Sequence, residues 1–237
     1  ARMIPPCFDP ATTSPGEQEV FRQIQHDPGT QDWIVIHSLD ITRHRRQIDG
    51  EIDFLILIPG FGVLDLEVKG HYSARRDSDG MWHLGGDPPT HKSPFKQASE
   101  NRYSVQYGLV HQRPEFRSVL FWSAVCFPFT NLGSAEGGGL AHREWHSWQL
   151  IEKRDFDSFP ISALVRSVLE SAARHVRATP VAKWFDPKVS LPTKKQCDEM
   201  ASFFRPRYEV FESPAERARE RTGELKRFTE DQFAVLD

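Results

Sequence analysis

Two apolar segments, residues 51–58 and 63–69, are joined by a short turn that contains two glycines. This arrangement predicts a β-hairpin, and it is the most informative feature of the chain. A turn centred near Gly60 pairs residues whose numbers sum to roughly 120–122. On that register Asp53 of the first strand lies opposite or diagonal to Glu67 of the second strand, so two acids meet beside strongly apolar strands.

The hairpin carries carboxylates at Asp53 and Glu67 and an amine at Lys69, which a purely structural hairpin would not need. Side chains alternate between the faces of a strand, so Asp65, Glu67 and Lys69 share one face. Neighbouring carboxylates repel, and partial burial raises the cost of ionising both. A divalent cation removes the conflict; Mg²⁺ suits oxygen ligands and would activate water, while Lys69 would orient that water or neutralise developing charge. The alternative is an exposed face whose charges pair across the strands, for instance Glu51 with Lys69.

Two further polar residues lie at predicted helix starts. The run Ser14-Pro15-Gly16-Glu17 has a capping serine, a proline suited to the first turn and an acid three residues after the cap. Ser93-Pro94 opens a second helix that runs to about Gln112, with Gln97 one turn inside it. Taken alone, Glu17 completes a helix cap and Gln97 faces solvent; the alternative is that both belong to the site of the acids.

Composition limits the classes of protein and partner. The formal net charge of the 237-residue chain is −3, so nucleic-acid binding would need a local patch. Arg43, Arg45 and Arg46 form such a basic cluster, which either binds phosphates or is a solvated loop. Three separated cysteines argue against a disulfide framework and indicate a reducing cytoplasm. No apolar run reaches membrane-spanning length, and no signal-peptide pattern is present.

The order of the predicted elements is α-β-β-β-α-β, which favours an α/β fold with a mixed central sheet flanked by helices. We expect four parts along the chain. They are a loose leader over residues 1–13, a main domain over 14–178, a helical, proline-containing linker over 179–219, and the start of a further region over 220–237.

Five strings occur in the same order as the motifs of one known family. They are Gly16-Glu17, Glu51-Ile52-Asp53-Phe54, the run from Gly62 to Gly70 that includes Glu67-Val68-Lys69, Gly80-Met81-Trp82, and Ser93-Pro94-Phe95-Lys96-Gln97. This ordered set resembles the NERD (nuclease-related) domain, a branch of the PD-(D/E)xK nuclease superfamily. The resemblance covers about residues 14–155, and no motif position departs from it.

The resemblance implies a PD-(D/E)xK-like core that hydrolyses phosphodiester bonds in DNA with Mg²⁺ or Mn²⁺. Asp53 and Glu67 would ligate the metal together with the Val68 carbonyl, and Lys69 would position the attacking water or stabilise the transition state. Glu17 and Gln97 would complete the site. Asp65 either binds metal or lies at the far edge of its strand. The alternatives are an RNA-directed nuclease and a non-catalytic DNA-binding or docking module.

The end of the chain, residues 227–237, resembles the adenine-recognition motif of UvrD-type superfamily-one DNA helicases. In such proteins Gln232 would contact adenine, and ATP would be a cofactor if a helicase domain follows. No Walker A string, G-x-x-x-x-G-K-[ST], occurs in the sequence. We therefore expect the N-terminal part of a nuclease–helicase protein of DNA repair or phage defence; the alternative is that residues 229–231 are an ordinary helix cap.

Overall fold

The computed structural model describes residues 1–41, 50–132 and 144–206. The chain divides into a compact unit over Ala1–Phe204 and a second unit over Arg205–Asp237. Several sequence predictions lie outside the described residues, namely the basic cluster Arg43, Arg45 and Arg46 and the adenine contact Gln232. None of the helices in the described ranges is both long and apolar enough to cross a membrane.

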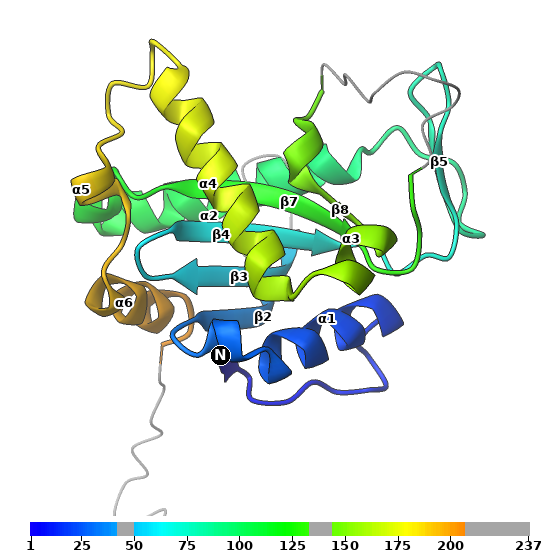
Figure 1. The fold of residues 1–237 in the computed structure, drawn as a ribbon, viewed down its shortest axis with the longest axis horizontal. Helices are drawn as coiled ribbons and strands as arrows, with labels where there is room; N and C mark the ends of the chain where they lie inside the picture. Colours follow the sequence, from blue (N-terminus) through cyan, green and yellow to red (C-terminus); the bar gives the residue numbers. More distant parts are fainter. Residues whose placement is uncertain (42–49, 133–143, 207–237) are drawn as a thin grey trace, which may run out of the picture. The chain divides into compact units, whose positions relative to one another are not determined.

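A six-stranded mixed sheet runs through the first unit in the order β1-β2-β3-β4-β7-β8 (Figure 1). Strands β2, β3 and β4 are antiparallel, whereas β1 with β2, β4 with β7, and β7 with β8 are parallel. A separate two-stranded sheet consists of β5 and β6. The strands are β1 Arg2–Ile4, β2 Ile34–Ile41, β3 Gly50–Ile58, β4 Gly62–Val68, β5 Ala74–Arg76, β6 Trp82–Leu84, β7 Phe121–Phe127 and β8 Leu150–Glu152.

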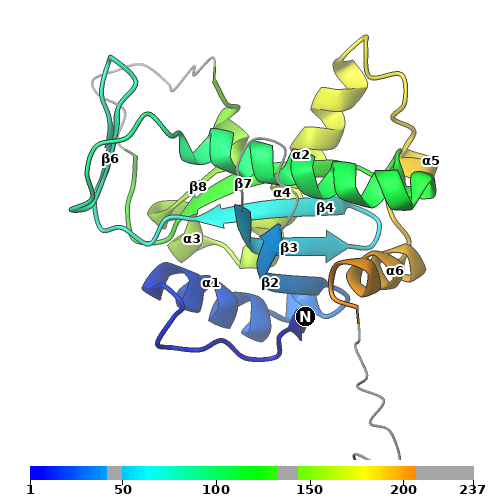
Figure 2. The same ribbon diagram turned by 180° about the vertical axis from the view of Figure 1, so that it is seen from behind.

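Helices cover both faces of the sheet, which confirms the predicted α/β class. The α-helices are α1 Pro15–His26, α2 Pro94–Gln112, α3 Lys153–Ser158, α4 Ile161–Ala178, α5 Pro187–Ser190 and α6 Lys194–Phe204. Short 3-10 turns occupy η1 Pro28–Thr30, η2 Pro114–Phe116 and η3 Ser147–Gln149. Helices α1, α3 and α4 lie on the face seen in Figure 1, and α2 and α6 lie on the opposite face, seen in Figure 2.

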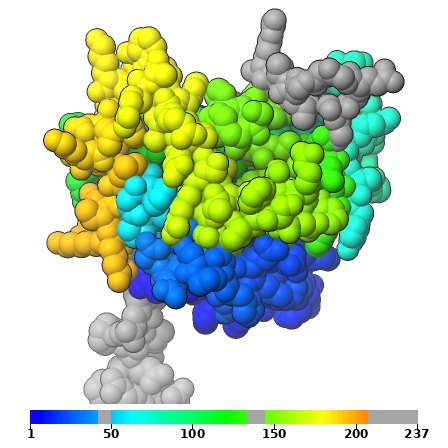
Figure 3. Space-filling model, in the orientation of Figure 1, coloured from blue at the N-terminus to red at the C-terminus, as the bar shows by residue number. Residues whose placement is uncertain are grey.

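The hairpin of β3 and β4 has the register that the sequence predicts. Phe54 lies opposite Leu66 and Leu57 lies opposite Val63, so paired numbers sum to 120. Phe54 and Leu66 pack into the core under α1 and α4, whereas Leu57 and Val63 pack into the core under α2 and α6. In Figure 3 the side chains of the blue and yellow-green segments close over the first face, and part of the cyan hairpin shows between them.

Two segments that the sequence assigns to a leader and a linker pack within the first unit. In the predicted leader, Arg2–Ile4 forms the edge strand β1, and Met3 is buried in the core. In the predicted linker, α6 buries Cys197 and Met200 against the opposite face of the sheet. The prolines around both segments led to the prediction of a leader and a linker, because prolines indicate turns. They do not indicate whether the apolar residues between them pack against the sheet.

Packing of α6 predicts that Met200 stabilises the sheet. We expect Met200→Ala to lower the free energy of unfolding by about 2–5 kcal/mol, because it deletes a side chain with no exposed surface and leaves a cavity. Lys195→Ala, on the solvent side of the same helix, should change it by less than about 0.5 kcal/mol. Urea unfolding of the three proteins measures this, and equal midpoints for parent and Met200→Ala would show that α6 is a mere linker.

Candidate active site

A cavity of about 550 Å³ opens at the end of the hairpin opposite its turn, between the starts of α1 and α2. All the residues that the sequence assigns to a catalytic or metal site line it. They are Glu17, Asp53, Glu67, Val68, Lys69 and Gln97. Strands β3 and β4 supply the acids and the lysine, and the two helices supply the glutamate and the glutamine from opposite sides.

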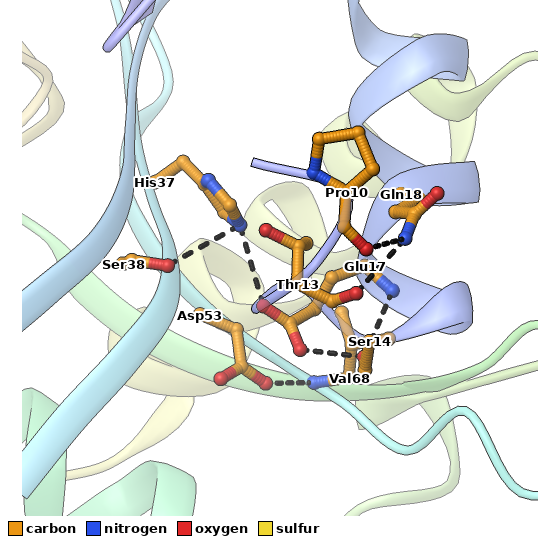
Figure 4. Close-up of polar contacts among 9 residues, drawn as sticks. All are labelled: Pro10, Thr13, Ser14, Glu17, Gln18, His37, Ser38, Asp53 and Val68. Atoms are coloured by element: carbon orange, nitrogen blue, oxygen red, sulfur yellow. Dashed lines mark hydrogen bonds and ion pairs between the residues drawn. The ribbon is translucent and has the colours of Figure 1, made fainter. Parts of the chain in front are cut away.

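Divergence of the two hairpin strands creates the space. The paired residues of β3 and β4 end at Phe54 and Leu66. Beyond that pair the Val68 N–H donates to Oδ2 of Asp53 at 2.7 Å, so a carboxylate oxygen takes the place of a backbone carbonyl (Figure 4). This bond fixes the Asp53 side chain between the strands.

A strained residue of β2 lies beside the divergence. Residues two apart on a strand share a face, but His37 contacts Phe21 of the α1 core while Leu39 packs into the opposite core. Between them Ser38 has φ 51°, in the left-handed region that non-glycine residues seldom adopt. The partners of His37 and Leu39 on β3 are Phe54 and Ile52, and they switch cores in the same way. Asp53 lies between them, at the point where the alternation changes.

Glu67 and Lys69 form a close ion pair. Lys69 Nζ donates to Oε1 of Glu67 at 2.6 Å, and the Glu67 side chain is 1% exposed. The other carboxylate oxygen, Oε2, is buried and has no hydrogen-bond partner in the described part of the chain. An unpartnered anionic oxygen in such a place is costly unless a cation or a proton reaches it.

Burial and mutual repulsion set the protonation of the acids. Burial, with the nearby Glu67 carboxylate, raises the pKa of Asp53 well above its usual value. Burial also raises the pKa of Glu67, although the Lys69 ammonium opposes that rise. The two acids therefore resist being ionised together, which is the conflict that the sequence indicates.

A contact between two glycines brings α1 to this site. A Cβ on Gly16 would lie 2.6 Å from the Cα of Gly70, closer than atoms can approach. The absence of side chains lets the first turn of α1 rest on the end of β4. Glu17, the next residue of the helix, thereby faces the cavity.

Two residues, Ser14 and His37, hold the carboxylate of Glu17 (Figure 4). Ser14 Oγ donates to Oε1 at 2.5 Å and also caps the helix by accepting from the Glu17 N–H. His37 Nε2 lies 3.3 Å from Oε2, and its ring packs against Phe21 and Phe54. Burial raises the pKa of Glu17, but the contacts with His37 and Ser14 outweigh it and hold that pKa below its usual value. Glu17 thus serves both as part of the cap and as a wall of the cavity.

The sequence reasoning missed several residues of the cavity. His71, Lys92 and Asn101 line it, and Asn101 Nδ2 donates to the Glu51 carbonyl at 2.6 Å, which fastens α2 to β3. His37 was missed because it lies in an apolar strand without a neighbouring polar pattern. Lys92 follows a proline-rich segment that predicts only irregular structure. Asn101 was within reach of a pattern, since it lies one turn after Gln97.

Asp65 is separate from the cavity. Its side chain is fully buried, and neither carboxylate oxygen has a partner among the described residues. Burial, with the charges of Glu67 and Asp53, raises its pKa well above the usual value. Burial thus favours the protonated form of Asp65, which lies inside the sheet and outside the lining of the cavity.

The donor set fits a hard cation with few protein ligands. No group of three or more His, Cys, Asp or Glu side chains is arranged to hold a metal ion in residues 1–41, 50–132 and 144–206. What the cavity offers is two carboxylates, Asp53 and Glu67, and the backbone of Val68 between the strands. Mg²⁺ is commonly bound through one or two carboxylates and keeps several waters, so the set with its unpartnered Oε2 fits it.

Comparison with known proteins agrees with the motif pattern. Residues 12–128 match the family model of the nuclease-related domain, NERD. The matched range contains Glu17, Asp53, Glu67, Lys69 and Gln97 and ends at the close of β7. Searches of the curated proteins and of the solved structures gave no significant match. No family match supports a helicase-like region over residues 220–237.

Asp65 should make stability depend on pH. Between the ordinary aspartate pKa and its raised value, the folded state keeps a proton that the unfolded chain releases, so the free energy of unfolding falls as pH rises. We expect Asp65→Asn to be about 1–3 kcal/mol more stable than the parent at pH 8 and nearly equal near pH 4. Urea unfolding in EDTA at both pH values measures this. The exposed Asp79→Asn should show no such difference, and an Asp65→Asn protein that is less stable at pH 8 would contradict the assignment.

His37 should control the ionisation of Glu17. His37→Phe removes the ring nitrogen while keeping an aromatic ring between Phe21 and Phe54, so burial would then act on Glu17 with only Ser14 opposing it. We expect the Glu17 pKa, followed by carbon NMR of the side-chain carboxyl, to rise in this variant. His37→Gln keeps an N–H donor and should retain the low pKa. An unchanged titration in His37→Phe would show that the contact is not what lowers the pKa.

Proposed function

We propose that this protein is a metal-dependent nuclease that hydrolyses phosphodiester bonds in DNA. The observation that carries the proposal is the meeting of Asp53, Glu67 and Lys69 in one cavity, where a buried carboxylate oxygen of Glu67 lacks a partner among the described residues. The match of residues 12–128 to the nuclease-related domain supports it. Together they favour phosphodiester chemistry over a structural role for the acids.

In this proposal Asp53, Glu67 and the Val68 carbonyl hold Mg²⁺ or Mn²⁺. When bound, the cation supplies positive charge to the phosphate and lowers the pKa of a coordinated water. The Val68 N–H holds one oxygen of Asp53 in place, which leaves the other oxygen for the cation. The closeness of the two acids, which costs free energy in the metal-free site, becomes favourable once the cation neutralises them.

Lys69 supplies charge to the reacting phosphate. Its Nζ lies 2.6 Å from Glu67 Oε1, so it stands beside the metal ligands, and its side chain remains 18% exposed toward the cavity. An ammonium in this position stabilises negative charge that develops on a phosphoryl oxygen or orients the attacking water. It does so from a low-dielectric wall, where such a charge acts strongly.

Glu17 and Gln97 act from the two sides of the cavity. The low pKa of Glu17 keeps its carboxylate ionised at neutral pH. It can therefore accept a hydrogen bond from a water bound to the metal or from the water that attacks the phosphate. Gln97 presents an amide from the first turn of α2 and would donate to a phosphate oxygen. Both residues orient groups around the reacting phosphate.

The second candidate is a DNA-binding or docking module without catalysis. The ion pair of Lys69 with Glu67 favours it, because it already neutralises one of the two acids. On either reading the Arg43, Arg45 and Arg46 cluster would contact DNA phosphates. The sequence pattern of residues 227–237 further suggests a helicase region in the same polypeptide, with Gln232 as its adenine contact and ATP as its cofactor.

Substitution of the lysine and the acid tests the nuclease. We expect Lys69→Ala and Glu67→Gln each to reduce DNA cleavage with Mg²⁺ or Mn²⁺ by about 100-fold or more, since each removes charge stabilisation at the reacting phosphate. A gel assay on single-stranded and duplex DNA, with circular dichroism to verify folding, measures it. The exposed Lys195→Ala serves as the control and should cut normally. If both site variants cleave DNA as well as the parent protein, the catalytic roles of Lys69 and Glu67 are wrong.

Metal titration separates the two candidates. Calorimetry should detect Mn²⁺ binding that disappears in Asp53→Ala and persists in Lys69→Ala, because the lysine is not a ligand. DNA binding that depends on salt but not on metal, in a parent protein that cuts no DNA, would favour the docking module instead.

A further inference from the structure

The first turn of α2 lies between two cavities. Lys92 and Gln97 line the cavity of the acids, whereas Ser93 and Lys96 line a second cavity, also about 550 Å³ in volume. The start of this helix therefore forms the wall between the two cavities. A ligand that extends beyond the first cavity in this direction meets the N-terminus of α2.

The amide groups at this end of α2 lack acceptors from within the helix. The first amide to bond back is that of Gln97, which donates to the Ser93 carbonyl at 2.9 Å. Pro94 has no N–H, so the donors left without an intrahelical partner are those of Phe95 and Lys96. Ser93 makes no side-chain cap bond to them, and the first turn contains no acidic residue. A 19-residue helix thus presents its positive end without a capping anion.

Ser93 provides the second, independent observation. Its residue surface is only 8% exposed, and its hydroxyl has no hydrogen-bond partner in the described ranges although it faces the second cavity. The hydroxyl is reachable from that cavity, so a ligand that enters the cavity can bond to it. A hydroxyl and two free amides at a helix start are the donors that bind a phosphate oxygen elsewhere in proteins.

The charges around this point favour an anion. His91, Lys92 and Lys96 surround the helix start, and none of them forms an ion pair with a described residue. In the second cavity Glu144 pairs with Arg76 at 2.6 Å, whereas Asp79 accepts a 3.4 Å hydrogen bond from the Met81 N–H and keeps its negative charge. At the helix start itself Lys92 and Lys96 together outweigh that one carboxylate.

The helix start is also held rigidly. Phe95 is buried and stacks on Trp145, with ring centroids 4.3 Å apart and parallel planes, and Trp82 packs against both rings. This packing fixes the direction of the amides of Phe95 and Lys96. A phosphate there would meet donors already in position, so little ordering entropy would be lost.

We propose that the N-terminus of α2 binds a second phosphate of the same nucleic-acid strand, next to the phosphate held in the cavity of the acids. The donors are the Ser93 hydroxyl and the amides of Phe95 and Lys96, with the Lys96 ammonium as the charged partner. Lys92 and Gln97 hold the reacting phosphate from the other side of the same turn. The identity of the ligand as nucleic acid rests on the proposed nuclease function; the phosphate site itself rests on the geometry of α2.

Ser93→Asp gives a sharp test, because aspartate is among the best helix caps. If Ser93 were only a cap residue, this variant would be as stable as the parent or more so, with unchanged binding of DNA. If Ser93 contacts a phosphate, the same stable variant places a carboxylate against it. We expect the dissociation constant for a fluorescein-labelled DNA oligonucleotide, measured by anisotropy in EDTA so that no bond is cut, to rise about tenfold or more.

Matched controls come from α6. Thr193 caps that helix by accepting from the Gln196 N–H, so Thr193→Asp makes the same change of charge at a helix start far along the chain. It should leave the affinity unchanged. Lys96→Ala should weaken binding and lower the slope of log affinity against log salt by roughly one, the value of one phosphate contact. Lys195→Ala, in the first turn of α6, should do neither.

Inorganic phosphate identifies the site without nucleic acid. In the parent its addition should shift the NMR amide signals of Phe95 and Lys96, and in Ser93→Asp it should not. Unchanged oligonucleotide affinity in a folded Ser93→Asp protein overturns the inference, as does a parent that binds free phosphate at α2 but no oligonucleotide. These results do not involve cleavage, so they stand apart from the outcome for Lys69→Ala and Glu67→Gln.

Discussion

The hydrogen bond from the Val68 N–H to the Asp53 carboxylate is the constraint on which the site depends. It occurs where the ladder of β3 and β4 ends, and it lets the strands separate without leaving that buried amide unpaired. Continued pairing would fill the space with backbone and turn the Asp53 side chain away. Three features follow from this replacement of a backbone carbonyl by a side-chain acceptor. They are the cavity itself, the exposure of the Val68 backbone to it, and the closeness of Asp53 to Glu67.

The same arrangement works against the stability of the sheet. Asp65 and Glu67 are buried and Asp53 is half-buried near them, and the Lys69 ammonium pairs with only one of the three acids. Acids placed this way are ionised at a cost that ordinary core residues do not carry. In the proposed function a cation would offset that cost at Asp53 and Glu67, whereas Asp65 lies outside the lining of the cavity. A loss of folding stability from buried charges is typical of functional sites, where the charges interact with a ligand.

Local patterns in the sequence predicted the parts of the site that are set by periodicity and caps. The hairpin register, the joint facing of Glu67 and Lys69 into the cavity and the helix starts before Glu17 and Gln97 depend on residues close in the chain. His37 was not predictable, because its contact with Glu17 joins residues 20 apart across two elements. The packing of β1 and α6 on the sheet was missed for the same reason. Both elements contact strands that are distant in the sequence, and neither a short strand nor a helix between prolines indicates which strands these are.

Two helix starts flank the acids, and their chemistry differs. At α1 the positive end of the helix is occupied by the chain itself: Ser14 caps it, and Glu17 in its first turn places a carboxylate there. Such a carboxylate is stabilised by the helix dipole, which helps to keep Glu17 ionised beside two other acids. At α2 the first turn carries no acid and Ser93 makes no cap bond, so its donors remain for a ligand. One helix thus stabilises a negative charge that belongs to the protein, while the positive end of the other carries no such charge. In the proposed function, a phosphate chain crossing the cavity would run from the acids toward α2.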